Sequence, residues 1–149
     1  MRPSDRIGIA WGGSGLVAQA AALRLVLQAG LAALPFPLVV RMTRLLAGVV
    51  AALRGRAPTP RDPRTIAWAV RAAGRRLPLA TSCLVEALAA KTLLDAERRP
   101  SRLRIGVCGG DGKPFQAHAW LECDGEVVAG AAGMGNFRPL MPLSLEGWL

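Results

Sequence analysis

The sequence is poor in the residues that build metal sites and disulfide frameworks. It contains only three cysteines (Cys83, Cys108 and Cys123) and one histidine, His118, and no C-x-x-C pair is present. Structural zinc sites usually draw on such pairs, so a site of this class is excluded. Three cysteines cannot all pair with one another, and we read no secretory leader at the start of the chain. We therefore expect a reduced, cytoplasmic protein that needs no metal.

Aromatic residues are also scarce, at 5%, whereas positive charge is abundant and unevenly placed. Residues 1–80 contain twelve arginines, no lysine and two acids, a net charge of +10, whereas residues 81–149 carry −1. A basic half of this kind could face an acidic partner, a membrane surface or nucleic acid. Its few aromatics form no stacking platform, so we expect no nucleic-acid binding. A GC-rich genome would produce the same excess of arginine.

No apolar run is long enough to be a clear transmembrane segment. The longest lies between Arg24 and Arg41, covers sixteen residues and is interrupted by Gln28, Pro35 and Pro37. A membrane-spanning helix needs about 20 apolar residues. We therefore expect buried or amphipathic helices here. A helix lying on a membrane surface remains an alternative that we do not favour.

The length of 149 residues fits a single domain, and 52% hydrophobic residues predict a packed core. We divide it into a hydrophobic, arginine-rich helical part over residues 1–60 and a core over residues 61–149. In the first part, helices are predicted over residues 16–33 and 38–54. Residues 54–63 contain three prolines and a glycine, which predict a loop.

Two further helices are predicted in the second part. The first begins with Asp62 as its N-cap and Pro63 in its first turn, and ends at Pro78. Its apolar stripe has helical spacing and consists of Ile66, Val70, Ala73 and Leu77. The second covers residues 82–97, with Thr81 or Ser82 as its cap. Alanine and leucine occupy most of its faces, which indicates a buried helix.

The pattern then changes from helical spacing to alternation. Strands are predicted over residues 101–108, 115–123 and 126–130, with a glycine-rich turn at 109–112 and a two-residue Asp124-Gly125 hairpin between the last two. Helices followed by an antiparallel meander predict an α+β fold.

Cys83 and His118 are the candidate catalytic residues. Cys83 lies in the first turn of a predicted helix, where unpaired N–H groups and the positive helix end favour a thiolate. His118 lies in the middle of a predicted strand, on the mixed polar face rather than on the apolar face that ends at Cys123. A cysteine at a helix start and a histidine on a neighbouring strand can act as nucleophile and base. Backbone N–H groups of Cys83 and its neighbour could then stabilise an oxyanion.

Structural roles for the same residues remain open. A cysteine in an Ala/Leu-rich helix is more often a small core residue, and a single histidine on a strand is usually a surface or hydrogen-bonded residue. Cys123 belongs to the apolar face and is expected to pack in the core. Cys108, beside the glycine turn, is expected to have no role. Trp120 shares the face of His118 and is expected to pack over the sheet.

The segments SCLVEALAAKTLL (82–94), LRIGVCGGDGKPFQAHAWLECDGEVVAG (103–130) and NFRPL (136–140) resemble the lasso-peptide biosynthesis B protein. The resemblance runs from about Arg64 to Leu143. That family consists of bacterial transglutaminase-like cysteine peptidases. The resemblance implies a transglutaminase/papain-like core, in which the nucleophile helix packs on a small antiparallel sheet. It matches Cys83 to the nucleophile and His118 to the general base. The chain has no room for a separate precursor-recognition domain and therefore resembles the split type of the family.

Families of this kind usually carry an aspartate on the strand after the histidine, and no such residue is present here. A two-residue hairpin would place His118 opposite about Ala131, in the segment Ala-Gly-Ala-Ala-Gly at 129–133. Asp124 and Glu122 lie about 20 and 13 Å from His118 along a strand, too far to orient its ring. Asn136, a backbone carbonyl or a water remain as alternatives.

The resemblance implies cleavage of a leader from a ribosomally made precursor peptide, without a cofactor. It also implies two protein partners, a leader-binding protein and an ATP-dependent macrolactam cyclase. An inactive scaffold that holds the precursor or the cyclase is the alternative function, motivated by the absent third side chain. Transfer of an acyl group to an amine is a minor variant of the same chemistry.

Overall fold

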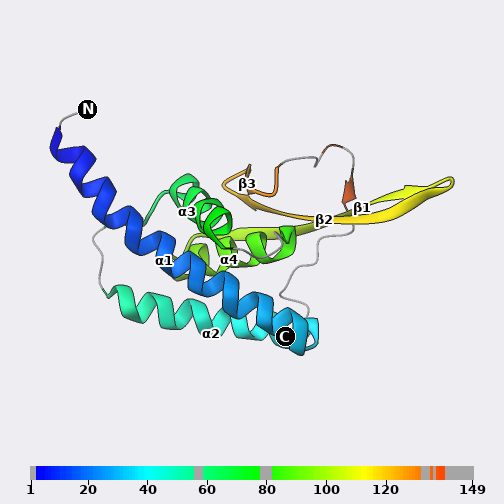
Figure 1. The fold of residues 1–149 in the computed structure, drawn as a ribbon, viewed down its shortest axis with the longest axis horizontal. Helices are drawn as coiled ribbons and strands as arrows, with labels where there is room; N and C mark the ends of the chain where they lie inside the picture. Colours follow the sequence, from blue (N-terminus) through cyan, green and yellow to red (C-terminus); the bar gives the residue numbers. More distant parts are fainter. Residues whose placement is uncertain (1–2, 56–58, 78–81, 132–134, 136, 140–149) are drawn as a thin grey trace.

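The part of the chain that the structure describes forms four helices and a four-stranded sheet, which confirms the expected α+β class (Figure 1). The computed structural model describes residues 3–55, 59–77, 82–131, 135 and 137–139. The helices are α1 (Pro3–Ala33), α2 (Phe36–Arg54), α3 (Pro63–Arg76) and α4 (Cys83–Ala96). The strands are β1 (Ser101–Gly110), β2 (Lys113–Cys123), β3 (Glu126–Ala129) and β4 (Arg138–Pro139).

Capping residues explain where three of the helices begin. Pro35 and Pro37 lie at the start of α2, where a missing backbone N–H costs nothing. As predicted, the Asp62 carboxylate caps α3 and accepts a hydrogen bond from the Arg64 backbone N–H at 2.7 Å. The Ser82 hydroxyl caps α4 by accepting from the Val85 backbone N–H at 3.4 Å. Of the two predicted caps for α4, Thr81 falls outside the described residues.

The predicted start of α1 at residue 16 is wrong, because the helix begins at Pro3. Glycines at 12, 13 and 15 weaken local helix propensity, since each costs a helix about 1 kcal/mol relative to alanine. α1 is nevertheless one continuous helix of 31 residues. It packs against both α3 and α4, and such tertiary packing is absent from local propensity.

The sheet is antiparallel, with strand order β3-β2-β1-β4. Asp124 and Gly125, with φ of 52° and 78°, form the predicted hairpin between β2 and β3. β1 and β2 are each two residues longer than predicted at the turn that joins them. The β1–β2 hairpin projects beyond the helices, and we call it the projecting hairpin (Figure 1). The short strand β4 was not predicted; it pairs with β1 at Gly106 and Val107.

The core lies between the sheet and the helices, with α4 at its centre. Helix α4 contacts β1 and β2 on one side and α1, α2 and α3 on the others (Figure 1). It is buried on most faces, as predicted. The apolar face of β2 enters this core only from Ala119 onward, because Phe115, 74% exposed, and Ala117 lie on the projecting hairpin. The apolar face that runs from Phe115 to Cys123 is therefore buried over only part of its length.

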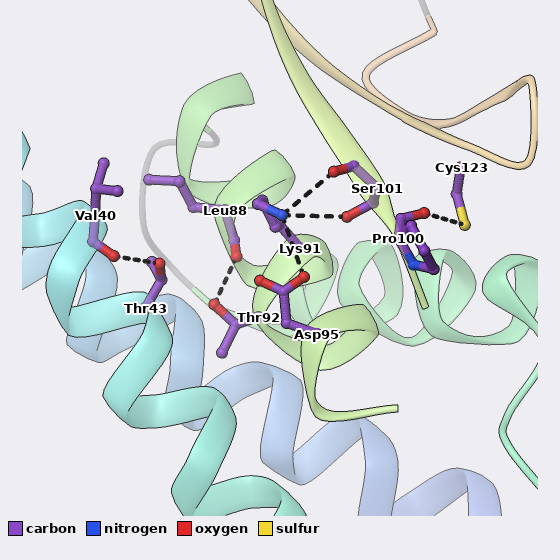
Figure 2. A network of polar contacts seen from close by, with 9 residues as sticks. All are labelled: Val40, Thr43, Leu88, Lys91, Thr92, Asp95, Pro100, Ser101 and Cys123. Atoms are coloured by element: carbon purple, nitrogen blue, oxygen red, sulfur yellow. Dashed lines mark hydrogen bonds and ion pairs between the residues drawn. The ribbon is translucent and has the colours of Figure 1, made fainter. Parts of the chain in front are cut away.

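A small polar network ties α4 to its surroundings. The Lys91 ammonium donates to the Asp95 carboxylate at 3.1 Å and to the Ser101 backbone carbonyl at 3.3 Å, and so joins α4 to the start of β1 (Figure 2). The Thr92 hydroxyl donates to the Leu88 carbonyl one turn earlier. Of these contacts, the one between Lys91 and Ser101 links α4 to the sheet.

Candidate active site

The half-buried Cys83 is the first residue of α4 and packs against the core. The Val85 N–H donates to Ser82 Oγ at 3.4 Å, and the Glu86 N–H donates to the Ser82 carbonyl at 3.0 Å. The N–H groups of Cys83 and Leu84 belong to the first turn and have no partner within the helix. Both therefore stand beside the thiol as donors that an anion or oxyanion could use.

The half-buried His118 lies in the middle of β2, directly opposite Gly106 of β1. Its Nε2 lies 2.6 Å from the backbone carbonyl oxygen of Gly130, which is a hydrogen-bonding distance. A carbonyl oxygen can only accept, so Nε2 must be the nitrogen that carries the hydrogen. In the neutral ring Nδ1 then holds a lone pair and can act as a base.

Aromatic packing holds the imidazole from two sides. The ring centroid of His118 lies 6.3 Å from that of Trp120, with the planes 24° apart, and 5.1 Å from that of Phe137. Trp120 is 3% exposed, so it packs under this layer as expected. The Trp120 indole N–H donates to Glu122 at 3.2 Å, and Arg104 donates to the other oxygen of that carboxylate, also at 3.2 Å. The ring on which His118 packs is thus itself held.

Two glycines make the room for this arrangement. A Cβ at Gly106 would lie 2.7 Å from the Trp120 ring and 2.9 Å from Phe137 Cβ. A Cβ at Gly130 would overlap the Ala119 carbonyl oxygen and lie 3.0 Å from Trp120 Cα. Gly130 also has φ of +76°, a conformation that favours glycine. A side chain at position 130 is therefore incompatible with the backbone that brings its carbonyl to His118.

An irregularity in the β2–β3 pairing shifts Gly130 along β2. The hairpin begins as predicted, with Cys123 opposite Glu126, but the register shifts by one between Leu121 and Glu122. Leu121 therefore faces Ala129 rather than Val128, so β3 takes up one extra residue and Gly130 comes level with about Trp120, from where its carbonyl reaches the His118 ring. Of the three alternatives for the orienting group, the structure supplies the backbone carbonyl. Asn136 falls outside the described residues.

Cys83 and His118 lie at the same level along the sheet. Cys83 is eight residues from Lys91, about 12 Å along a helix, and Lys91 is bonded to Ser101 at the start of β1. Because α4 and β1 run in opposite directions, Cys83 lies level with about Ile105, some four strand residues from Ser101. Ile105 pairs with Ala119, the neighbour of His118.

The two side chains are nevertheless not joined. Ala119, Leu121 and Cys123 face α4 in the core, so strand alternation puts His118 on the opposite face of β2. Within the described residues, no hydrogen bond links Cys83 and His118. Among the residues that the structure describes, β3 pairs with β2 only as far as Leu121.

The other two cysteines have different surroundings. Cys123 is buried and its thiol lies 3.4 Å from the Pro100 carbonyl oxygen, as expected of a core residue (Figure 2). Burial, and secondarily the Asp124 carboxylate, raise the pKa of the Cys123 thiol, which keeps it protonated. Cys108 is half-buried and lies 3.9 Å from the Gln116 side-chain oxygen on the projecting hairpin. Neither stands at a helix start.

The acidic residues near the hairpin are engaged away from the ring. Glu122 binds Arg104 and Trp120, and Asp124 lies 3.7 Å from Arg99. Among the described residues no group of three or more His, Cys, Asp or Glu side chains could hold a metal ion.

The comparisons with known proteins identify a family but no close relative. No curated protein and no solved structure matches the chain. The family model of the transglutaminase-like superfamily matches residues 30–142, a range that includes α2, α3, α4, the whole sheet, Cys83 and His118. The fold is consistent with the core of that family, in which a helix packs on a small antiparallel sheet. The chain therefore belongs to the transglutaminase-like superfamily.

Proposed function

We propose that the chain is a cysteine peptidase that removes the leader from a lasso-peptide precursor. The observation that carries the proposal is the 2.6 Å contact between His118 Nε2 and the Gly130 carbonyl, which leaves Nδ1 as a base. The position of Cys83 at the start of α4 supplies the matching nucleophile. Membership of the transglutaminase-like superfamily supports peptidase-type thiol chemistry, and the resemblance to the B protein names the substrate.

In the proposed reaction Nδ1 of His118 takes the proton of the Cys83 thiol. The thiolate forms a bond to the scissile carbonyl carbon, and the Cys83 and Leu84 N–H groups donate to the resulting oxyanion. The C–N bond then breaks, and the imidazolium gives its proton to the leaving amine. Water, deprotonated by the same ring, cleaves the thioester and releases the leader with a free carboxylate. The thiol must come within hydrogen-bond reach of Nδ1 during this cycle.

The proposed reaction takes place in the cytoplasm and uses no cofactor. A precursor peptide, a leader-binding protein and an ATP-dependent macrolactam cyclase are the proposed partners. The leader-binding protein presents the cleavage site, and the cyclase closes the product.

Mass spectrometry of leader cleavage tests the proposal. A precursor and a leader-binding protein from the same gene cluster are incubated with wild type, Cys83→Ala and His118→Ala. Cys108→Ala is the matched control, because this thiol is also half-buried but lies away from any helix start. We expect one cleavage site, a loss of about 10³-fold or more in each of the first two variants, and none in the control. Equal cleavage by Cys83→Ala would exclude the proposed nucleophile.

A non-catalytic scaffold is the second candidate. It is favoured by the position of His118 on the face of β2 that points away from α4. Such a protein would bind the precursor or the cyclase without cutting it. Binding measured by calorimetry, together with no cleavage by wild type in the presence of the leader-binding protein, would support the scaffold over the peptidase. Appearance of an amine adduct in the same spectra would indicate acyl transfer instead of hydrolysis.

A further inference from the structure

Helix α2 is apolar on both of its sides, although only one side is buried. Its inner side contributes Val39, Val40, Ala47 and Val50 to the core. Its outer side forms a stripe at helical spacing, in which Leu45 is 73% and Leu53 78% exposed; the stripe consists of Leu38, Arg41, Leu45, Val49 and Leu53. Leucines this exposed in a row are unusual on a soluble surface and mark a site of interaction.

Helix α1 repeats the pattern beside it. From Gly15 to its end, its only charged residue is Arg24, which is buried. The exposed positions are all apolar or glycine: Gly15, Ala18, Ala22, Leu25, Val26, Ala29, Ala32 and Ala33. Figure 1 shows α1 and α2 together on the side of α4 that faces away from the sheet. We call this surface the α1–α2 face.

The helices could not both be surrounded by lipid. Gly15–Ala33 and Phe36–Arg54 are each long and apolar enough to cross a membrane by length and composition. Yet each buries one side in the protein core, α1 through Leu23 and Leu27 and α2 through Val39 and Val50. This one-sided burial fits helices that lie in the plane of a membrane surface.

The charges on the α1–α2 face indicate what kind of surface it meets. Within residues 15–53 the exposed charged side chains are Arg41 and Arg44, and no acidic residue occurs. Arg41 lies on the stripe between Leu38 and Leu45. Arg44 borders it on the side of Asp95, where its charge opposes the burial that raises the pKa of that carboxyl. Long arginine stems can lie along apolar surface while their guanidinium groups reach lipid phosphates.

We propose that the α1–α2 face binds the surface of an anionic lipid bilayer, with α2 inserted along its stripe. The outer side of α2 has no polar side chain besides its two arginines. It therefore suits contact with hydrocarbon, which forms no hydrogen bonds. Anionic headgroups complement those arginines, at about fivefold in affinity for each. The sheet and the candidate active site lie on the far side of α4, so they stay accessible from solution while the protein is bound.

Flotation with lipid vesicles tests this proposal. The full chain is mixed with vesicles of phosphatidylglycerol and phosphatidylcholine, or of phosphatidylcholine alone, and the bound fraction is measured. We expect binding to the anionic vesicles and much weaker binding to the neutral ones. The double variant Leu45→Glu/Leu53→Glu should bind about tenfold more weakly or worse, because both leucines lose apolar contact and gain negative charge. Both positions are so exposed that the variant should melt at the wild-type temperature.

A matched control distinguishes binding through the α1–α2 face from nonspecific binding through any exposed apolar residue. Phe115→Glu replaces a residue as exposed as Leu45 on the projecting hairpin, and it should bind vesicles like wild type. Arg41→Gln/Arg44→Gln should lose only the preference for anionic lipid. No vesicle binding by wild type, or equal loss in the Phe115 control, would overturn the proposal. So would a dimer in light scattering that Leu45→Glu/Leu53→Glu disrupts without any change in vesicle binding, since the face would then bind a second copy.

Discussion

Substituting Gly130 with alanine should disturb both the fold and the tautomer of His118. The new Cβ would overlap the Ala119 carbonyl oxygen and lie 3.0 and 3.1 Å from Trp120 Cα and Cβ, so the backbone at 130 has to move. That movement takes the carbonyl away from Nε2, which it contacts at 2.6 Å. The perturbation therefore acts on the orienting group without altering a catalytic side chain.

Gly125→Ala is the matched control for the cost of backbone conformation. Gly125 has φ of +78°, nearly equal to the +76° of Gly130, but nothing lies within 4 Å of a Cβ built there. An alanine in this left-handed region costs about 1 to 2 kcal/mol in either place. At Gly130 the overlap and the lost hydrogen bond add about 2 kcal/mol. The difference in unfolding free energy between the two variants thus measures the cost of the close contacts at position 130.

The expected melting temperatures follow from these free energies. For a domain of this size about 1 kcal/mol shifts Tm by about 2 to 4 °C. Gly125→Ala should lower Tm by about 2 to 8 °C and Gly130→Ala by about 6 to 16 °C, measured by circular dichroism. An equal shift in the two variants would refute the packing argument at Gly130.

The tautomer can be read directly, because His118 is the only histidine in the chain. Nitrogen-15 NMR of histidine-labelled protein without a polyhistidine tag should show the neutral ring protonated at Nε2. Gly130→Ala should give a mixture of both tautomers, whereas Gly125→Ala should not. Protonation at Nδ1 in the wild-type ring would refute the assignment of Gly130 as the orienting group, whatever the melting temperatures show.

Three further predictions concern stability and reactivity. Glu97→Ala should cost about 3 kcal/mol in urea unfolding, because its side chain, 5% exposed, forms an ion pair with Arg54 that joins α4 to the end of α2. Burial raises the pKa of Asp95 above its ordinary value of 3.8 despite the opposing Lys91 ammonium, so the contribution of Asp95 to stability should fall as pH rises from 3.8 through its folded-state pKa. Asp95→Asn should lack this slope in urea titrations at several pH values. Cys123 should resist iodoacetamide in the native protein and react in urea, as mass spectrometry of the alkylated peptides would show.

Features that depend on neighbouring residues in the chain were predictable from the sequence. The Asp62-Pro63 start of α3 and the Asp124-Gly125 hairpin each need only a few adjacent residues, and the structure confirms both. The start of α1 was mispredicted and the exposure of Phe115 was not foreseen, because both depend on which segments pack together. The alternation of apolar residues along β2 does not show how far the helices cover the β1–β2 hairpin.

The candidate site divides in the same way. The sequence identified Cys83 at a helix start, which the structure confirms, and excluded a side chain as the partner of His118 near position 130. It left the carbonyl, Asn136 and a water as alternatives, because the backbone path that brings the Gly130 carbonyl to the ring has no clear local signal. The glycines at 106 and 130 were the available clue. Both lie where a Cβ would collide with Trp120.

A backbone carbonyl differs from an aspartate in what it can do for the imidazole. It adds no negative charge, so it stabilises the imidazolium less than a carboxylate would. It does accept hydrogen bonds without ever donating one, and therefore permits a single tautomer at His118. In serine proteases an asparagine in place of the orienting aspartate lowers kcat by about 10⁴-fold, because its amide selects the wrong tautomer. The Gly130 carbonyl avoids that failure. The proposed peptidase would thus keep the orienting part of a triad and rely on the start of α4 for charge.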